Sequence, residues 1–413
     1  MGSSVAGVKT AEALRSHGWT DPVTLIGAED ELPYDKPPLS KELLAGVLSE
    51  PANLLLTHDA AERAQIALKL GSPAVALDTH ARLVTLANGE RVGYDTLVAS
   101  TGARARPSPW GQPDGVHLLR TIADVRALRG ELVLGGHLVV IGGGFIGAEA
   151  SATALGLGMT VQIVDPAPVP MSRVLGEEVG QILSSLHWRH GVETLFGIGV
   201  SRISVDNSTT TPAGHPGLTV HLDNGSALSA DTVLVGIGTI TNHEWMEGSG
   251  IRLENGVVCD QFCRVEGTLG IYAAGDLARW FHPRHDTLTR VEHWTNAVEQ
   301  AQTVAYNIMH PDQPQPYAPV EYIWSDQYEW KVQITGQTGR ESNMIVQDEH
   351  RADRFAVLYT DARGRYSGAM TANWPRALVA CRRAVGSGVT ATTLRASLEE
   401  LALRKTSSGV ATP

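Results

Sequence analysis

The sequence predicts an α/β protein with two Rossmann-like dinucleotide-binding domains, the first of them discontinuous, and a smaller C-terminal α+β domain. A glycine-rich turn that opens a helical pattern occurs twice, at residues 2–7 and 142–147. A glycine-aspartate turn, Gly275-Asp276, ends a strand-like run far downstream. Short strand patterns then begin at Tyr322. We therefore expect the second dinucleotide-binding domain to be inserted into the first.

Composition narrows the class of protein. A chain of 413 residues with 43% hydrophobic content can bury the cores of two or three domains. Its net charge of -11 argues against a nucleic-acid partner. The sequence shows no apolar run of membrane-spanning length and no signal peptide before the first turn, so we expect a soluble, cytoplasmic protein without membrane contact. Three cysteines fit a reducing compartment, and the scattered histidines predict no metal site.

The first turn carries Gly2, Ser4 and Gly7, and a helix is expected over residues 5–16. Strand 23–26 follows, and Glu29 stands where a carboxylate accepts hydrogen bonds from ribose hydroxyls. A buried strand normally precedes such a turn, and this sequence lacks it. Either the true start lies upstream or neighbouring backbone compensates. The alternative interpretation is an ordinary helix start capped by Gly-Ser-Ser.

The second turn has every neighbour that a dinucleotide site needs. The patterns of a strand, a glycine turn, a helix and a further strand follow in order, at residues 138–141, 142–147, 148–155 and 161–164. Asp165 ends the last strand. A carboxylate there bonds the adenosine ribose and repels a 2′-phosphate, which favours NADH over NADPH. The alternative for Asp165 is a solvated acid at a strand end.

The third element contains two expected strands, residues 231–238 and 270–274, and then Gly275-Asp276. An aspartate at the carboxyl end of a strand can hold a ribityl hydroxyl. A helix is expected over residues 291–310, and its N-terminus would stabilise negative charge on a reduced flavin. Its alternative role is core packing alone.

Several longer motifs carry a resemblance to a known family. They are GGGFIGAE, IYAAGD, RVEHWTNAVEQA, LPYDKPPLSK, STGAR and YIWSDQY, at residues 142–149, 271–276, 290–301, 32–41, 100–104 and 322–328. In their order the chain resembles the FAD-dependent pyridine nucleotide oxidoreductases. Within them it is similar to the ferredoxin reductase branch, which includes putidaredoxin reductase and the reductases of aromatic-ring dioxygenases. The resemblance runs from Gly2 to about Arg383.

The resemblance implies two cofactors, FAD and NADH. It implies hydride transfer from NADH to flavin N5, and then transfer of single electrons to a 2Fe-2S ferredoxin that serves a cytochrome-type monooxygenase or a ring-hydroxylating dioxygenase. The C-x4-C and C-x-x-C pairs of dithiol reductases are missing from the sequence, so the electrons are expected to leave the flavin directly. Direct reduction of a quinone, monodehydroascorbate or oxygen, and a non-catalytic FAD/NADH-binding protein, remain open. So does the choice between a monomer and a homodimer.

The resemblance also assigns residues. Lys41 matches a lysine beside flavin N5, Glu149 its ionic partner, and Trp324 an aromatic near flavin and nicotinamide or, alternatively, a packing residue. Lys36 stands where relatives commonly have arginine, so the charge remains and a bidentate fork is lost. The expected FAD site is Gly2, Ser4, Gly7, Glu29, Lys36, Lys41, Thr101, Gly102, Arg104, Gly275, Asp276, Glu292, His293, Trp294 and Trp324. The expected NAD site is Gly142, Gly144, Phe145, Ile146, Gly147, Glu149, Asp165, Gly236, Ile237 and Gly238.

A basic segment and the motif boundaries complete the predictions. Arg279, Arg284 and Arg290 form a patch that can steer an acidic ferredoxin, unless they pair inward with local acids. The flavin domain is expected at residues 1–107 and 232–312 and the nicotinamide domain at 108–231. The C-terminal domain is expected at 320–405, followed by a disordered tail, 406–413.

Overall fold

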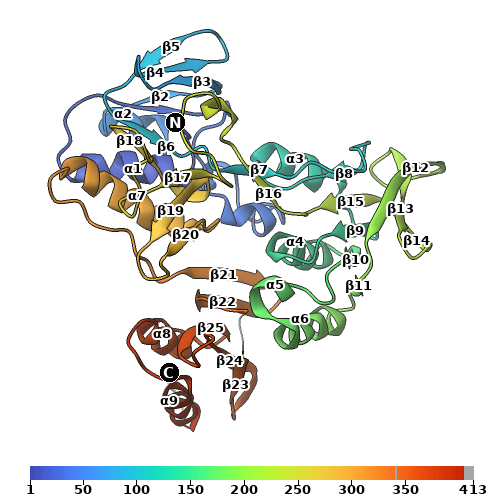
Figure 1. Ribbon diagram of the computed structural model, residues 1–413. Coiled ribbons are helices and arrows are strands. Elements are labelled where there is room, and N and C mark those ends of the chain that lie inside the picture. Colours follow the sequence, from blue (N-terminus) through green and yellow to red (C-terminus); the bar gives the residue numbers. More distant parts are fainter. Residues whose placement is uncertain (340–341, 404–413) are drawn as a thin grey trace, which may run out of the picture. The chain divides into compact units, whose positions relative to one another are not determined.

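The computed structural model describes residues 1–339 and 342–403, so the predicted tail lies outside the described residues. The chain divides into two compact units. Figure 1 labels the helices and strands of both units. The first unit comprises residues 1–109, 117–130 and 236–319, and the second comprises residues 110–116, 131–235 and 320 onward. The expected division into three domains remains a prediction.

Parallel strand pairs organise the first unit. They are β1 (Val23–Ile26) with β2 (Ile66–Lys69), β6 (Leu97–Ala99) with β18 (Ile271–Ala273), and β17 (Val257–Cys259) with β19 (Ala278–His282). Antiparallel partners are β20 (Thr287–Thr289) on β19, β7 (Ala103–Ala105) with β16 (Thr239–Thr241), and the meander β3 (Ala74–Asp78), β4 (Leu83–Leu86) and β5 (Arg91–Gly93).

Met1 and Gly2 connect two of these pairs. The amide of Ser100 donates to the carbonyl of Met1 at 2.7 Å, and the Met1 amino group donates to the carbonyl of Val98 at 2.8 Å. On the other side, the amide of Gly2 donates to the carbonyl of Ile26 at 2.7 Å. These two residues therefore lie between β1 and β6 and place the first glycine turn at the carboxyl ends of both strands.

The first unit has four helices among its described residues: α1 (Val5–Ser16), α2 (His58–Arg63), α3 (Ile122–Glu131) and α7 (Trp294–Met309). α1 packs against α7, as Figure 1 shows. The core of the unit joins small residues of these helices to β6, β17 and β18 around the fully buried Trp280. The small side chains allow the helix and sheet backbones to approach closely.

The segment 117–130 belongs to the first unit. Specific contacts account for this placement. The backbone N–H of Ile122 donates to the Tyr34 hydroxyl at 3.1 Å. Arg126 forms ion pairs at 2.6 Å with Glu31 and Glu50.

The second unit contains a parallel sheet in the order β11 (Glu193–Phe196), β10 (Thr160–Asp165), β9 (His137–Ile141) and β15 (Thr232–Val235). The short strand β8 (Val116–His117) lies at the chain crossing between the units. The helices near this parallel sheet in the sequence are α4 (Phe145–Gly156), α5 (Ser172–Leu175) and α6 (Glu177–Arg189). A separate antiparallel sheet of the second unit contains β12 (Val200–Thr210), β13 (Pro216–Leu222) and β14 (Ala227–Ala230). Because β15 pairs with β9, residues 232–235 belong to this sheet.

The C-terminal part of the second unit is an antiparallel sheet covered by helices. Its strands follow the order β21 (Tyr322–Gln327), β22 (Trp330–Gly336), β25 (Tyr366–Ala372), β24 (Arg351–Thr360) and β23 (Ser342–Asp348), and its helices are α8 (Pro375–Ala384) and α9 (Ala391–Leu403). Side chains alternate along β24. Phe355 and Val357 pack with α5 and α6, whereas Ala356 and Leu358 pack with α8 and α9. Helices therefore pack on both faces of the sheet at β24.

The structure confirms the predicted α+β character of the C-terminal part and the α/β class of the chain. Helix 5–16 and strand 23–26 coincide with α1 and β1. α4 begins three residues before its predicted start because Gly144 is its N-cap. In the part of the chain that the structure describes, no helix has the length and apolar character needed to cross a bilayer.

Candidate functional site

The first glycine turn is sterically closed to larger residues at two positions. Gly2 has φ +110°, and a Cβ on it would lie 2.1 Å from the carbonyl oxygen of Ser100. A Cβ on Gly7 would lie 1.9 Å from the carbonyl oxygen of Gly2. Ser4 is the N-cap of α1, and its side chain makes no capping hydrogen bond with the helix. The turn therefore has the close packing of a phosphate-binding turn, and the Gly-Ser-Ser interpretation as a side-chain cap is not supported.

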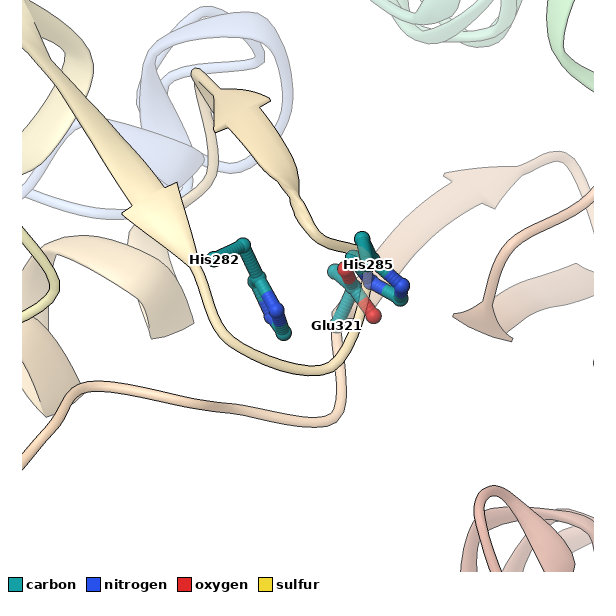
Figure 2. Close-up of side chains that lie close together, drawn as sticks. All are labelled: His282, His285 and Glu321. Atoms are coloured by element: carbon teal, nitrogen blue, oxygen red, sulfur yellow. The ribbon is translucent and has the colours of Figure 1, made fainter.

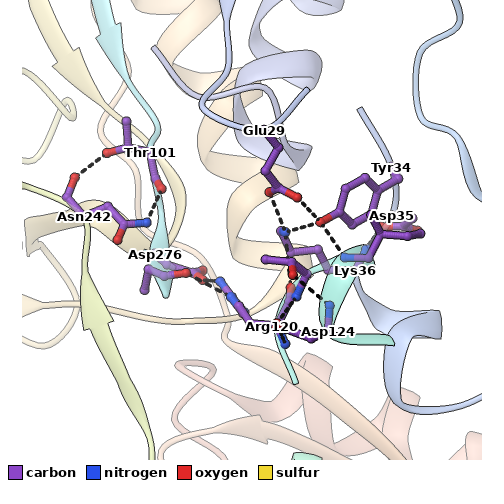
Figure 3. Close-up of polar contacts among 12 residues, drawn as sticks. Glu29, Tyr34, Asp35, Lys36, Thr101, Arg120, Asp124, Asn242 and Asp276 are labelled. Atoms are coloured by element: carbon purple, nitrogen blue, oxygen red, sulfur yellow. Dashed lines mark hydrogen bonds and ion pairs between the residues drawn. The ribbon is translucent and has the colours of Figure 1, made fainter. Parts of the chain in front are cut away.

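An acid, a phenol and a lysine meet near this turn, as Figure 3 shows. The Tyr34 hydroxyl donates to Glu29 Oε2 at 2.6 Å, and Lys36 Nζ lies 3.8 Å from Glu29 Oε1. Burial lowers the pKa of Lys36 to about 8 and raises the pKa of Tyr34. Since a buried ammonium favours an anionic neighbour, Lys36 is positioned to bind a phosphate.

Arg120 lies in the same cluster and was not among the predicted residues. Its Nη2 lies 2.6 Å from Asp276 Oδ2, and its backbone carbonyl oxygen lies 3.4 Å from Lys36 Nζ. Its Nε donates to the carbonyl of Ala103 at 2.9 Å. The sequence next to Arg120 does contain a pattern that could have pointed to it. Thr121 and Asp124 have the spacing of a helix capping box, and their side chains and backbone amides bond reciprocally. This box marks the start of α3, where a cation can face a ligand.

The second strand-end segment of the first unit contains Thr101 and Gly102. The Thr101 hydroxyl donates to the backbone carbonyl of Asn242 at 2.6 Å, and Asn242 Nδ2 donates back to the carbonyl of Thr101 at 2.9 Å. Arg104 bonds Asn242 Oδ1 at 2.9 Å and pairs with Glu244 at 2.6 Å. The arginine adjacent to Lys36 is Arg120, and the FAD contact expected of Arg104 remains a prediction.

The Gly275-Asp276 turn and the start of α7 close this set of residues. The backbone N–H of Gly275 donates to Gln300 Oε1 at 2.8 Å, which holds the turn against α7. Trp294 is the first residue of α7 and donates from Nε1 to Asp35 Oδ1 at 2.7 Å. His293 is the N-cap and makes no capping hydrogen bond with its side chain.

Glu292 precedes α7 and accepts a hydrogen bond from the Thr239 hydroxyl at 2.6 Å.

The first unit brings together, near two helix N-termini, an acid, two cations and a strand-end aspartate: Glu29, Lys36, Arg120 and Asp276. This donor set fits a flavin dinucleotide, which needs ribose acceptors, phosphate donors and a partner for the ribityl chain.

The second glycine turn follows β9 in the second unit. Gly142 has φ +117°, and a Cβ on Gly147 would lie 2.1 Å from the carbonyl oxygen of Gly142. Gly144 differs, because a Cβ there would meet nothing within 4 Å. The fold itself therefore does not require a glycine at position 144. An open space in front of a helix N-terminus fits a pyrophosphate, which has to approach the backbone closely.

Asp165 is fixed at the end of β10 by two backbone groups. The N–H of Gly143 donates to Oδ2 and the N–H of Ala167 donates to Oδ1, each at 2.7 Å. These bonds orient the carboxylate beside the glycine turn, and they disfavour the interpretation of Asp165 as a merely solvated acid.

The three residues expected to act on hydride transfer lie in different units. Lys41 follows the short helix η1 (Pro37–Ser40) in the first unit, and its Nζ donates to the carbonyl of Pro37 at 3.1 Å. Glu149 on α4 and Trp324 on β21 belong to the second unit. The ring of Trp324 stacks on Tyr322 with 6.1 Å between centroids. The expected Lys41–Glu149 ion pair stays a prediction, as do the roles of Gly236, Ile237 and Gly238, which belong to the first unit.

The cysteines are unsuited to a thiol relay. Cys259, Cys263 and Cys381 are all fully buried, and they are the only cysteines of the chain. Burial raises the pKa of Cys263 and of Cys381 to about 12, and it raises that of Cys259 as well. Because the thiolate is the reactive form, these side chains are chemically quiet at neutral pH.

The predicted docking arginines make contacts inside the first unit. Arg279 pairs with Glu254 at 2.8 Å, and Arg290 donates to the carbonyl of Asp276 at 3.1 Å and pairs with Glu292. Arg284 donates to two backbone carbonyls at residues 318–319. These carbonyls are neutral, and the structure shows no ion pair of Arg284 with an acid among residues 1–339 and 342–403. Arg279 and Arg290 thus follow the inward-pairing alternative, and Arg284 does not.

Two histidines lie in the same segment as these arginines. Figure 2 shows His282 at the end of β19 and His285 in the turn to β20. Their rings stack with 4.0 Å between centroids and an interplanar angle of 26°. Arg284 lies in this turn, and its backbone N–H donates to His282 Nδ1 at 3.2 Å.

Comparison with known proteins covers nearly the whole chain. Residues 1–301 match the family model described as pyridine nucleotide-disulphide oxidoreductase, and residues 322–407 match the model described as reductase C-terminal. Members of the first family bind FAD and NAD(H).

Curated relatives and a solved structure agree with these matches. The chain is 36% identical to the ferredoxin--NAD(+) reductase component of the anthranilate 1,2-dioxygenase system of Burkholderia cepacia, over 94% of this chain and 93% of the relative. It is 34% identical to putidaredoxin reductase of Pseudomonas putida, over 87% and 84%. The structure of the covalent putidaredoxin reductase-putidaredoxin complex matches with a TM-score of 0.88 at 31% identity, over 95% of this chain and 94% of that chain.

Proposed function

Because the chain belongs to the pyridine nucleotide-disulphide oxidoreductase family, we propose that it is an FAD-dependent NADH:ferredoxin reductase. One observation supports this proposal above others. The chain has two glycine turns, each followed by its own strand-end acid, and its cysteines are all buried. The protein therefore offers no reactive thiol that could reduce a disulphide substrate or relay electrons. Electrons have to leave from the cofactor itself.

The first unit supplies the residues for FAD. The N-terminus of α1 would hold the pyrophosphate, with positive charge from Lys36 and Arg120. Glu29 would bind the adenosine ribose, and Asp276 would bind the ribityl chain. FAD supplies the chemistry that no side chain offers here: it accepts two electrons as a hydride and passes them on singly. In the second unit, the turn at Gly142, Gly144 and Gly147 would hold the NADH pyrophosphate, and the carboxylate of Asp165 would hold its ribose.

Three side chains are proposed for the hydride step. Lys41 is an ammonium whose charge shapes the region near flavin N5. Glu149 is its counter-charge, because a desolvated ammonium needs one. Trp324 provides an aromatic surface for the nicotinamide. These groups position and polarise, and the reaction requires no general acid or base from the protein.

The electron acceptor is proposed to be a 2Fe-2S ferredoxin, in the cytoplasm, that serves a cytochrome-type monooxygenase or a ring-hydroxylating dioxygenase. The names of the relatives support a ferredoxin, and the complex with putidaredoxin supports direct docking of such a protein. Arg284 is the strongest of the three docking candidates because the carbonyls that its side chain contacts are neutral. We expect a modest salt dependence, since Arg279 and Arg290 are paired internally.

Steady-state reduction of cytochrome c tests this proposal. We expect the FAD-loaded protein with NADH to reduce cytochrome c at least about tenfold faster when a 2Fe-2S ferredoxin is added, and NADPH to replace NADH poorly. Ferredoxin-independent reduction of a quinone at the same rate would instead favour a small acceptor. Failure of NADH to bleach the flavin would contradict the enzyme proposal.

A further inference from the structure

A buried chain of polar side chains joins the C-terminal sheet to α4 inside the second unit. The Ser325 hydroxyl donates to Glu149 Oε1 at 2.7 Å, and Gln327 Nε2 donates to Ser325 Oγ at 3.3 Å. Ser325 and Gln327 are fully buried, and Glu149 is 4% exposed. Polar groups buried to this degree are costly without partners, so these two hydrogen bonds are specific contacts, although Gln327 Oε1 has no hydrogen-bond partner among the described residues.

The direction of the hydrogen bonds follows from the chemistry of the three groups. A serine hydroxyl has one hydrogen, and an ionised carboxylate can only accept. The hydrogen of Ser325 therefore goes to Glu149, the stronger acceptor, and the oxygen of Ser325 is left to accept from the amide of Gln327. Donation by Gln327 polarises the hydroxyl and strengthens its bond to the carboxylate.

The geometry of β21 makes this arrangement rigid. Ser325 and Gln327 are two residues apart, so they point to the same face of the strand, and Trp324 points to the other. β21 contacts α4, and both elements border one hydrophobic core that includes Ala148 and Val332. These contacts fix the carboxylate of Glu149 about one helical turn after the start of α4, the helix that follows the second glycine turn.

We propose that Ser325, supported by Gln327, is a positioning residue that orients the Glu149 carboxylate for hydride transfer. This inference depends on the proposed function, in which Glu149 faces the reacting groups. The C-terminal domain then contributes to catalysis through a hydroxyl that itself touches neither cofactor. A misdirected carboxylate would slow the hydride step and leave nucleotide binding nearly unchanged, since Ser325 lies outside the glycine turn.

The first test compares Ser325→Ala with Ser367→Ala. Ser367 is on the same sheet, and its hydroxyl donates to the carbonyl of Gln337 at 2.9 Å. In anaerobic stopped-flow mixing of the FAD-loaded proteins with NADH, we expect Ser325→Ala to lower the limiting rate of flavin reduction at least about tenfold. Its NADH dissociation constant should stay within about threefold of the parent value, and Ser367→Ala should match the parent in both. Equal slowing in both variants, or none in Ser325→Ala, would overturn the proposal.

A double-mutant cycle with Glu149→Ala separates this inference from the proposed function. If Ser325 acts through Glu149, adding Ser325→Ala to Glu149→Ala should change the rate by less than about twofold. If Glu149→Ala reduces its flavin as fast as the parent, the role of Glu149 itself fails. If Glu149→Ala is slow and Ser325→Ala slows it independently, only the present inference fails.

Unfolding in urea provides a readout that does not depend on activity. Ser325→Ala removes one hydrogen-bond donor from a buried carboxylate, so it should lower the urea midpoint of the parent protein measurably. The same change in the Glu149→Ala background should lower the midpoint by less than half as much. Equal shifts in both backgrounds would show that Ser325 stabilises the sheet without acting on Glu149, and would overturn the proposal.

Discussion

A Gly144→Thr variant is expected to lose about a hundredfold in NADH affinity while it unfolds at nearly the same urea concentration as the parent protein. The open space around Gly144 explains both the weaker NADH binding and the unchanged stability. A Cβ at position 144 meets no protein atom within 4 Å, so the fold accommodates the side chain. Threonine is also a good N-cap residue, and position 144 is the N-cap of α4. The added methyl and hydroxyl groups instead occupy the region that the pyrophosphate must enter.

Two other glycines of the same helix provide the controls for this variant. Gly156 also has open space around its Cβ direction, and it lies at the far end of α4. Gly156→Ala should bind NADH normally and be slightly more stable, because alanine favours a helix. Gly147→Ala should be strongly destabilised by contact with the carbonyl of Gly142. Normal NADH affinity in Gly144→Thr, measured by titration of the flavin absorbance, would contradict the assignment of this turn.

Lys36 is expected to make FAD binding dependent on pH. Burial lowers its pKa to about 8 in the cofactor-free protein, and a bound pyrophosphate raises that pKa again. The side chain is therefore charged in both states below pH 8, and FAD affinity is flat there. Above pH 8 binding has to take up a proton, so affinity should fall by up to about tenfold per pH unit until the pKa of the complex is reached. Fluorescence titration of the deflavinated protein between pH 7 and 10 measures this fall.

Two substitutions define the test of Lys36. Lys36→Arg keeps its charge across this range, so it should bind FAD with an affinity that stays flat to pH 10. Lys36→Met should bind FAD about tenfold to a hundredfold more weakly at pH 7, since it loses a charge-assisted contact. Lys69→Met is the matched control, because Lys69 pairs with Glu90 at the exposed surface. A fall above pH 8 that persists in Lys36→Arg would assign the effect to another group.

The lowered pKa of Lys36 also affects the stability of the cofactor-free protein. There a rise in pH increases the free energy of unfolding, whereas it weakens FAD binding. A lysine whose folded pKa lies below its unfolded value binds fewer protons in the folded state between the two values. The contribution of Lys36 to the free energy of unfolding thus becomes more favourable as the pH rises through 8. Bound FAD removes this tendency, so cofactor binding and the charge of Lys36 are linked.

Local patterns in the sequence predict the regular elements well. α1 and β1 coincide with their predicted ranges because periodic apolar positions and glycine stops determine them locally. The family, the α/β class and the reductase activity implied by the motifs agree with the comparisons. Glycine turns can be predicted in the same way, because their contacts join residues that are close in the sequence. The contact between Gly7 and the carbonyl of Gly2 is an example.

Long-range pairing explains what the sequence did not reveal. Arg120 bonds Asp276 across 156 residues, and no local periodicity reports such a contact. Asn242 reaches Thr101 in the same way. β15 pairs with β9, and such strand pairing depends on partners far along the chain. The Ser325–Glu149 bond likewise needs both elements in place.

Stoichiometric ferredoxin reduction after thiol alkylation tests the central claim most directly. The native, FAD-loaded protein is treated with N-ethylmaleimide, reduced anaerobically with one equivalent of NADH and mixed with excess 2Fe-2S ferredoxin. Because Cys259, Cys263 and Cys381 are fully buried, we predict that the treated and untreated proteins reduce the same amount of ferredoxin, about two molecules per NADH. Loss of ferredoxin reduction after alkylation, or none before it, would contradict direct transfer from the cofactor.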